Sequence, residues 1–65
     1  MKIQVNGAWR EVSSGVLAGA LEDLGYGASV VSTAVNGEFV PATARLQTAL
    51  AEGDRIEVLA PMQGG

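Results

Sequence analysis

The chain has 65 residues, 48% of them hydrophobic, and its seven acidic and four basic residues give a formal net charge of −3. A chain of this length forms one small domain whose core supplies roughly 3–5 kcal/mol of net stability. It contains neither cysteine nor histidine, which excludes disulfides, zinc sites of the common cysteine type and the usual general base near neutral pH. We therefore expect a globular protein that binds no metal or cofactor of its own.

Charge distribution and hydropathy argue against two classes of partner. The basic residues are scattered along the chain, whereas a nucleic-acid site needs them clustered. No apolar run approaches the ~20 residues of a membrane span, and the first residues lack the pattern of a signal segment. We expect no nucleic-acid or membrane partner, a cytoplasmic location, and a monomer when the protein is free.

The first predicted elements are two strands joined by a tight turn. "KIQVN" alternates, with Ile3 and Val5 on one face, which is typical of a strand with one buried side. Asn-Gly follows, the strongest short signal for a hairpin. In the returning strand, "WREV", we expect Val12 to point inward with Arg10 on its face, which leaves Trp9 outward. A slip of one residue would bury Trp9 instead.

One clear helix is predicted in "SSGVLAGALEDLG", residues 13–25. Ser13 or Ser14 is expected to cap its first amide groups. Apolar residues recur at i, i+3, i+4 and i+7 and form a single stripe: Leu17, Ala20, Leu21 and Leu24. The stripe gives the helix one face with which to cover a sheet.

The second half of the chain alternates strands with turns. "VVSTAVN" is rich in β-branched residues and ends in a second Asn-Gly pair, which predicts a strand and a tight turn. "EFVP" is a short strand, and Pro41 puts it at a sheet edge because proline lacks a ladder donor. "TARLQTAL" is predicted to form a helical turn, with Leu46 and Leu50 as core contacts.

The last strand, "RIEVLA", carries the outward side chains nearest the end of the chain. Three of its residues share the face opposite to Ile56 and Val58: Arg55, Glu57 and Leu59. Single exposed apolar residues are ordinary, but Leu59 and Trp9 would form a docking patch if they share the open side of the sheet. The charged residues beside Leu59 would orient a partner more than raise its affinity; the alternative is that they simply solvate this face of the strand.

The order of these elements predicts a fold. One helix must cover one face of a mixed sheet of four to five strands, because no other segment can do so. The last strand is expected beside the first and parallel to it. This is the α+β arrangement called the ubiquitin-like β-grasp fold, in which residues 1–60 form the domain and the other sheet face is open to solvent or to a partner.

Residues 61–65, "PMQGG", are predicted to be a flexible tail. Pro61 ends the strand because it cannot extend the ladder. Gly64 and Gly65 lack a Cβ and so suit a narrow channel, and five extended residues span at most roughly 17 Å. On composition alone a frayed end is the ordinary interpretation. The alternative is a carboxylate that enters another protein's active site.

Several segments together resemble one family. "MKIQVNG", "VNGEFVP" and "LAEGDRIEVLAPMQGG" are similar to the ThiS-type sulfur carrier proteins of thiamine biosynthesis, over essentially the whole chain. The most specific parts are the Asn-Gly pair before "VP", the turn at Gly53-Asp54 and the final Gly-Gly. One departure is visible: many relatives carry an arginine soon after the proline that matches Pro41, where this chain has Ala42 and Thr43.

The resemblance implies that the chain is a co-substrate and not an enzyme. An adenylyltransferase similar to the ubiquitin activators would use ATP to adenylate the carboxylate of Gly65, which follows Gly64. A sulfur donor protein would then convert it to a thiocarboxylate, which gives its sulfur to thiazole synthase. Besides the glycines, the residues expected to contact these partners are Trp9, Arg55, Glu57, Leu59, Pro61, Met62 and Gln63.

Related β-grasp proteins leave alternatives open. The small subunit of molybdopterin synthase shares the fold and the Gly-Gly ending but forms a stable enzyme with a large subunit. A ubiquitin-like modifier would join Gly65 to a lysine of a target, and a binding module would have an idle tail. Carriers for other sulfur-containing metabolites look alike. The short chain and "VNGEFVP" favour the thiamine carrier.

Overall fold

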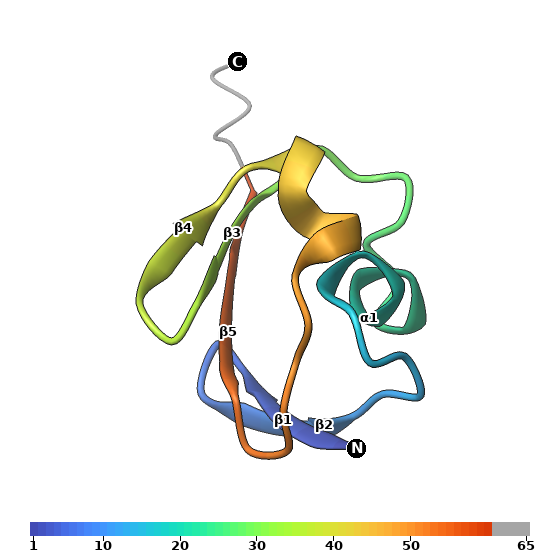
Figure 1. Ribbon diagram of the computed structural model, residues 1–65, viewed down its shortest axis with the longest axis vertical. Coiled ribbons are helices and arrows are strands. Elements are labelled where there is room, and N and C mark those ends of the chain that lie inside the picture. The colour runs from blue at the N-terminus through green and yellow to red at the C-terminus, as the bar shows by residue number, and fades with distance from the viewer. Residues whose placement is uncertain (61–65) are drawn as a thin grey trace.

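The computed structural model describes residues 1–60, and the predicted tail of residues 61–65 lies outside the described residues. The elements follow one another along the chain (Figure 1) as β1 (Lys2–Val5), β2 (Ala8–Glu11), α1 (Leu17–Asp23), β3 (Ser32–Val35), β4 (Glu38–Val40), a 3-10 helix η1 (Ala42–Gln47) and β5 (Arg55–Leu59). In this part of the chain five strands form one sheet in the order β2-β1-β5-β3-β4. β5 is parallel to β1 and antiparallel to β3. The ubiquitin-like β-grasp fold is therefore confirmed, with the last strand at its centre.

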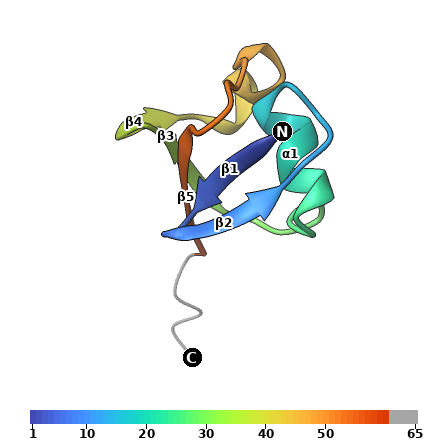
Figure 2. The same cartoon turned by 90° about the horizontal axis from the view of Figure 1, so that it is seen from below.

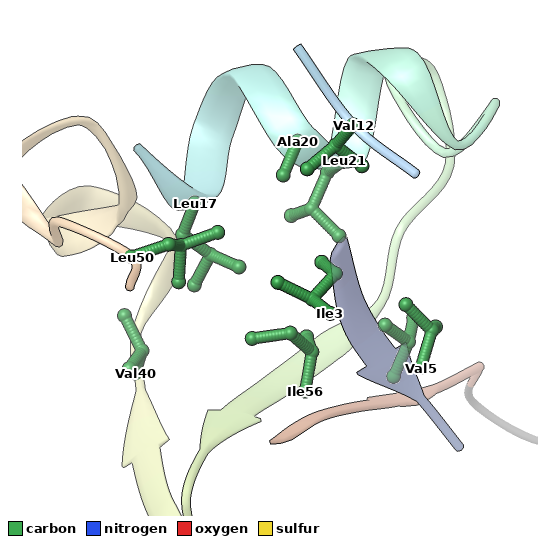
Figure 3. Close-up of a cluster of buried hydrophobic side chains, with 10 residues drawn as sticks. Ile3, Val5, Val12, Leu17, Ala20, Leu21, Val40, Leu50 and Ile56 are labelled. Atoms are coloured by element: carbon green, nitrogen blue, oxygen red, sulfur yellow. The ribbon is translucent and has the colours of Figure 1, made fainter. Parts of the chain in front are cut away.

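α1 lies on one side of the sheet, as Figures 1 and 2 show from two directions, and the core side chains lie between them. Alternate residues of β1 and β5 point toward the helix, which buries its own apolar stripe against them (Figure 3). The buried apolar residues are Ile3, Val5, Val12, Leu17, Ala20, Leu21, Val40, Leu50, Ile56 and Val58. Within residues 1–60 no helix covers the opposite face of the sheet. We call that side the open face.

The pairing of β1 with β2 decides between the two registers that the sequence allowed. Ile3 is opposite Arg10, and Gln4 is opposite Trp9. Residues opposite one another in a sheet share a face, so Arg10 lies on the core side and Trp9 on the open side. Val12 is buried just beyond the strand. The register with Val12 inward is therefore confirmed.

The predicted start of the helix is wrong. α1 begins at Leu17, and its N-cap residue, Val16, makes no capping hydrogen bond through its side chain. The backbone amide of Leu17 donates to the carbonyl of Thr48 instead, at 2.9 Å. The segment before the helix turns back to its far end, and the hydroxyl oxygen of Ser14 accepts from the amide of Val16, the residue before the helix, at 3.2 Å.

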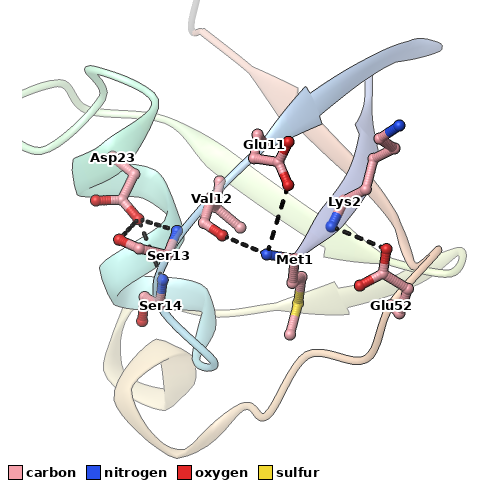
Figure 4. Close-up of polar contacts among 8 residues, drawn as sticks. All are labelled: Met1, Lys2, Glu11, Val12, Ser13, Ser14, Asp23 and Glu52. Carbon is pink, nitrogen blue, oxygen red and sulfur yellow. Dashed lines mark hydrogen bonds and ion pairs between the residues drawn. The ribbon is translucent and has the colours of Figure 1, made fainter.

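Asp23 at the end of α1 ties down the loop that leads into the helix (Figure 4). Its Oδ2 accepts hydrogen bonds from the amide and hydroxyl of Ser13 at 2.8 and 3.0 Å. It also accepts one from the amide of Ser14, at 3.2 Å. These serines were predicted to cap the helix start, but their amides are donors to its last residue. The loop and the helix form one closed unit as a result.

The predicted core contact of Leu46 is also wrong, because its side chain is 71% exposed. Residues 42–47 form a 3-10 helix, which has three residues per turn, so side chains four apart do not align as they do in an α-helix. Leu50 follows the helix and is buried as predicted. Its amide donates to the carbonyl of Gly15 at 2.9 Å.

A polar network fastens η1 to the sheet. Thr33 is buried among apolar residues, and its hydroxyl donates to the carbonyl of Val40 at 2.8 Å. The same oxygen accepts a hydrogen bond from Nε of Arg45, at 3.1 Å. Nη2 of Arg45 donates to the carbonyl of Val31, at 2.6 Å. Each of these buried groups has a partner, which offsets the cost of removing it from water.

Candidate functional site

The predicted docking residues of β5 lie together on the open face. Burial alternates along this strand, so Ile56 and Val58 enter the core while Arg55, Glu57 and Leu59 point the other way. Leu59 is 71% exposed although it is a large apolar residue. It is also the last residue of the strand, and Ala60 is the last residue that the structure describes. The candidate site therefore sits where the chain leaves the sheet.

A surface hollow runs along this side of β5 between the two hairpin turns. Its lining residues are Gln4, Asn6, Gly7, Gly37, Arg55, Ile56, Glu57 and Leu59. Among the described residues, apart from each glycine and its two chain neighbours, no heavy atom lies within 4 Å of the position that a Cβ would take at Gly7 or Gly37. Both turns therefore leave the sides of the hollow open. We call this feature the open-face hollow.

Two exposed aromatic side chains stand on either side of the open-face hollow. Trp9 is 57% exposed on β2 and lies opposite Gln4. Phe39 is exposed on β4 and lies opposite Ala34, whose other neighbour across the sheet is Glu57. Trp9 and Phe39 thus face the same way as the outward residues of β5. Apolar surface is concentrated around the charged middle of this face.

Trp9 and Leu59 share the open face but are not neighbours. Trp9 is in the same row as Arg55, because both are paired with Gln4. Leu59 lies four residues further along β5 and two strands away, which corresponds to roughly 16 Å at ordinary strand dimensions. A partner must span the hollow to contact both side chains.

Phe39 is the site residue that the sequence reasoning missed. The sequence did contain the information needed to place Phe39 on the open face, because Val40 is the next residue along the same predicted strand. An inward Val40 requires Phe39 to face outward, because side chains alternate between the two faces. The structure confirms this alternation, with Val40 buried and Phe39 exposed.

Two asparagine side chains hold β5 in place, one from each hairpin turn. Both have left-handed backbone conformations, with φ of 52° at Asn6 and 51° at Asn36. The carboxamide of Asn6 accepts from the amide of Val58 at 2.9 Å and donates to its carbonyl at 3.0 Å. The carboxamide oxygen of Asn36 accepts from the amide of Arg55 at 2.9 Å. The turns were predicted, but these contacts with the central strand were not.

The carboxylate of Asp54, just before β5, is held by hydrogen bonds. The pKa of Asp54 lies below its ordinary value because its carboxylate accepts from the backbone amide of Ala51 and from the side chain of Asn36. These bonds are 2.8 and 3.0 Å long. They fix the turn that enters β5, one residue before Arg55. Arg55 and Glu57 carry opposite charges, so the middle of the open-face hollow has little net charge.

A second hollow lies on the helix side, between α1 and η1. Its lining includes Leu21, Glu22, Tyr26, Arg45 and Leu46. The guanidinium of Arg45 is already a donor to Val31 and Thr33. Among residues 1–60, no group of three or more histidine, cysteine, aspartate or glutamate residues is placed to hold a metal ion. In the same part of the chain no helix has the length and apolar character needed to cross a membrane.

The remaining predicted site residues cannot be located on this fold. Pro61, Met62, Gln63, Gly64 and Gly65 lie outside the described residues. Their predicted roles in partner contact and in the reaction stay predictions. What the structure provides is the strand from which they continue, and the open face beside it.

A small β-grasp sheet with one open face and a central last strand defines a ubiquitin-like protein. The ThiS family model matches residues 3–65, so the chain belongs to the ThiS family. Among solved structures, the thiamine biosynthesis protein (ThiS) from Geobacter metallireducens is similar, with a TM-score of 0.82 and 29% identity over 100% of both chains. A search of curated proteins found no match. The resemblance seen in the sequence is confirmed.

Proposed function

We propose that this protein is a sulfur carrier of thiamine biosynthesis whose reactive group is the carboxylate of Gly65. The observation that carries the proposal is the ThiS family match, which extends through the final Gly-Gly. The fold supports it, because the strand that leads to those residues is the central one of the sheet. β5 is paired with β1 at its start and with β3 through to Leu59, and this pairing gives the following residues a firm origin.

The proposed chemistry takes place at the end of the chain and in two steps. A carboxylate oxygen of Gly65 attacks the α-phosphate of ATP, and pyrophosphate leaves. Sulfide supplied by a sulfur donor protein then attacks the carbonyl carbon of the acyl-adenylate, and AMP and a proton leave to give a thiocarboxylate. Glycine suits both steps because it has no Cβ to crowd a narrow site or the tetrahedral centre.

The catalytic groups for these steps belong to the partners. The chain has no histidine or cysteine, the usual sources of a base or nucleophile near neutral pH. An adenylyltransferase resembling the ubiquitin activators would bind ATP, and thiazole synthase would receive the sulfur. The protein itself acts as a co-substrate in this scheme.

The open face is the proposed docking surface for these partners. Leu59 provides an exposed apolar side chain at the end of the last strand, and burying it against a partner would remove apolar surface from water. Trp9 and Phe39 widen the surface on either side of the open-face hollow. Arg55 and Glu57 orient the partner through charge. Pro61, Met62 and Gln63 would continue from this surface toward the partner's active site.

The proposal is tested by incubating the protein with its cognate adenylyltransferase, ATP and a sulfur donor, and then measuring its intact mass. A sulfur carrier gains the mass difference between sulfur and oxygen, and the gain maps to the last peptide. A ubiquitin-like modifier would appear instead in adducts of higher mass. An unchanged mass would mean that the proposed function is wrong.

A variant that lacks Gly65 is the matched control. It should show no mass gain, because the carboxylate is shortened by one residue and no longer reaches the nucleotide. Its thermal unfolding should be the same as that of the full chain. A large loss of stability on deletion would indicate that the terminus is a structural element and not a free reactive group.

A further inference from the structure

Asn6 lies beside β5 at the point where β5 extends beyond the end of β1. β1 pairs with β5 only through Gln4 with Arg55 and Val5 with Ile56. β1 then ends at Val5, while β5 continues to Leu59. The amide and carbonyl of Val58 therefore face the first hairpin turn, and within residues 1–60 no strand lies beside them on that side. Unpaired backbone groups at such a position weaken the end of a strand.

The carboxamide of Asn6 takes the place of the missing strand. Its carbonyl oxygen is an acceptor and its NH2 group carries two donors, so it can offer the acceptor and the donor that a peptide unit would. It uses both on Val58, with bonds of 2.9 and 3.0 Å, and its own backbone amide donates to the carbonyl of Ile56 at 3.0 Å. The hydrogen bonding on this side of β5 thereby continues from Ile56 to Val58, the residue that precedes Leu59.

Asn36 provides an internal comparison at the other end of the same strand. Its backbone amide donates to the carbonyl of Arg55 at 2.7 Å, and its carboxamide oxygen accepts from the amide of Arg55 at 2.9 Å. The two asparagines have nearly the same φ and are each followed by glycine. They differ in which end of β5 they hold: Asn36 holds its start, and Asn6 its exit.

We propose that Asn6 is a positioning residue for partner docking, an inference that rests on the proposed sulfur-carrier function. By fixing Val58, it holds the backbone of Leu59 and the origin of the tail in one place on the open face. Leu59 then docks without a loss of backbone freedom, and such preorganisation lowers the cost of binding. The contacts of Asn6 are with the backbone of β5, and in this role it takes no part in the chemical step.

This role predicts a change in KM without a change in kcat. Substituting Asn6 leaves the reacting carboxylate intact, so the adenylation rate of the docked complex is preserved. It removes an interaction that serves binding equally in the ground state and in the transition state, and the loss of such uniform binding raises KM alone. Two hydrogen bonds of ordinary net strength correspond to a rise of about tenfold.

The test compares Asn6→Gly with the matched variant Asn36→Gly. Glycine keeps the left-handed turn at low cost, so each variant deletes mainly a carboxamide. Hydrogen exchange of individual amides is measured first. Asn6→Gly should speed exchange at Val58 by about tenfold and leave Arg55 unchanged, because only the Val58 amide loses its acceptor. Asn36→Gly should do the reverse.

Steady-state adenylation is then measured with the cognate adenylyltransferase, below the unfolding temperature of both variants. Asn6→Gly should raise KM for the carrier by about tenfold with kcat unchanged, whereas Asn36→Gly stays within about twofold of the parent. Equal KM values for the two variants, or a fall in kcat alone, would overturn the inference. If Asn6→Gly does not fold, Asn6→Asp, which keeps the acceptor for the Val58 amide but puts a carboxylate oxygen against its carbonyl, should also raise KM, and an unchanged KM would overturn the inference.

The parent protein separates this inference from the proposed function. If the parent gains the sulfur mass and the two glycine variants behave alike, the sulfur-carrier function holds and only the role of Asn6 is wrong. If the parent gains no sulfur mass, the proposed function is wrong and the docking role of Asn6 is wrong with it.

Discussion

On one side of β5, Ile56 is 1% exposed and packs under the helix, whereas on the other side Leu59 is 71% exposed. The covered and open faces of the sheet are therefore built from alternate residues of a single strand. The covered face holds the fold together, and the open face contributes little to stability because its side chains keep their contact with water. The two faces differ by one residue step along the chain, so single substitutions can separate stability from docking.

The largest effect is expected on the covered face. Ile56→Ala should reduce the free energy of unfolding by about 2–5 kcal/mol, because it removes buried apolar contacts and leaves a cavity. A domain of this size has roughly 3–5 kcal/mol in total. The variant should therefore be largely unfolded, or unfold at much lower urea concentration than the parent protein, as followed by circular dichroism.

Glu57→Ala is the matched control, one residue further along and on the open face. Its unfolding free energy should stay within about 0.5 kcal/mol of the parent value, as for most surface substitutions. If Ile56→Ala and Glu57→Ala were equally destabilising, the division between the two faces would be wrong.

The sequence predicted most of the fold because its local patterns agree with its tertiary structure. Alternation identified the strands, both Asn-Gly turns form hairpins, and the parallel pairing of β1 with β5 followed from element order. The errors arose where a distant group decides the outcome. Ser13 contacts Asp23, ten residues away, and Leu17 contacts Thr48, so local capping rules could not give the helix start.

The candidate site was predicted only in part for the same reason. Alternation within β5 was sufficient to put Leu59 on the open face. Spacing within one strand cannot give distances between strands, so the separation of Trp9 from Leu59 required the sheet order. The contacts of Asn6 and Arg45 join residues far apart in sequence, to Val58 and to Val31 and Thr33. No local pattern in the chain indicates either contact.

A smaller effect is expected on the open face, where a substitution should weaken binding and leave stability unchanged. Leu59→Ala should leave the unfolding free energy within about 0.5 kcal/mol of the parent value. It should weaken binding to the adenylyltransferase by about tenfold, since burying a leucine side chain is worth about 1.5–3 kcal/mol and alanine keeps only part of that apolar surface. Isothermal titration calorimetry at constant salt would measure the affinity.

Val30→Ala is the control for this measurement, because Val30 is 82% exposed but precedes β3 and is not among the outward residues of the sheet. Its affinity for the adenylyltransferase should match that of the parent. If both substitutions weakened binding equally, exposed apolar area in general would explain the affinity, and the open face would lose its special role.

The smallest expected effect is on how the stability of the fold depends on pH, and it arises on the helix side of the sheet. The pKa of Asp23 lies below its ordinary value, chiefly because the Ser13 backbone amide donates to the carboxylate, with the Ser13 hydroxyl and the Ser14 amide adding to the effect. The unfolded chain therefore takes up a proton at a pH where the folded protein does not. This contribution to stability is present above about pH 3.9 and is lost as pH falls through the lower folded pKa.

Asp23→Asn should flatten this dependence without abolishing it, because the pKa of Asp54 is lowered in the same direction and its contribution is lost over a similar range. Thermal unfolding midpoints of the parent and the variant, measured from about pH 6 to about pH 3, would show the difference in slope. At neutral pH the variant should bind the adenylyltransferase as tightly as the parent, since Asp23 belongs to the helix that packs on the covered face. A loss of affinity at neutral pH would mean that the two faces are coupled, and that the helix side influences how the open face docks.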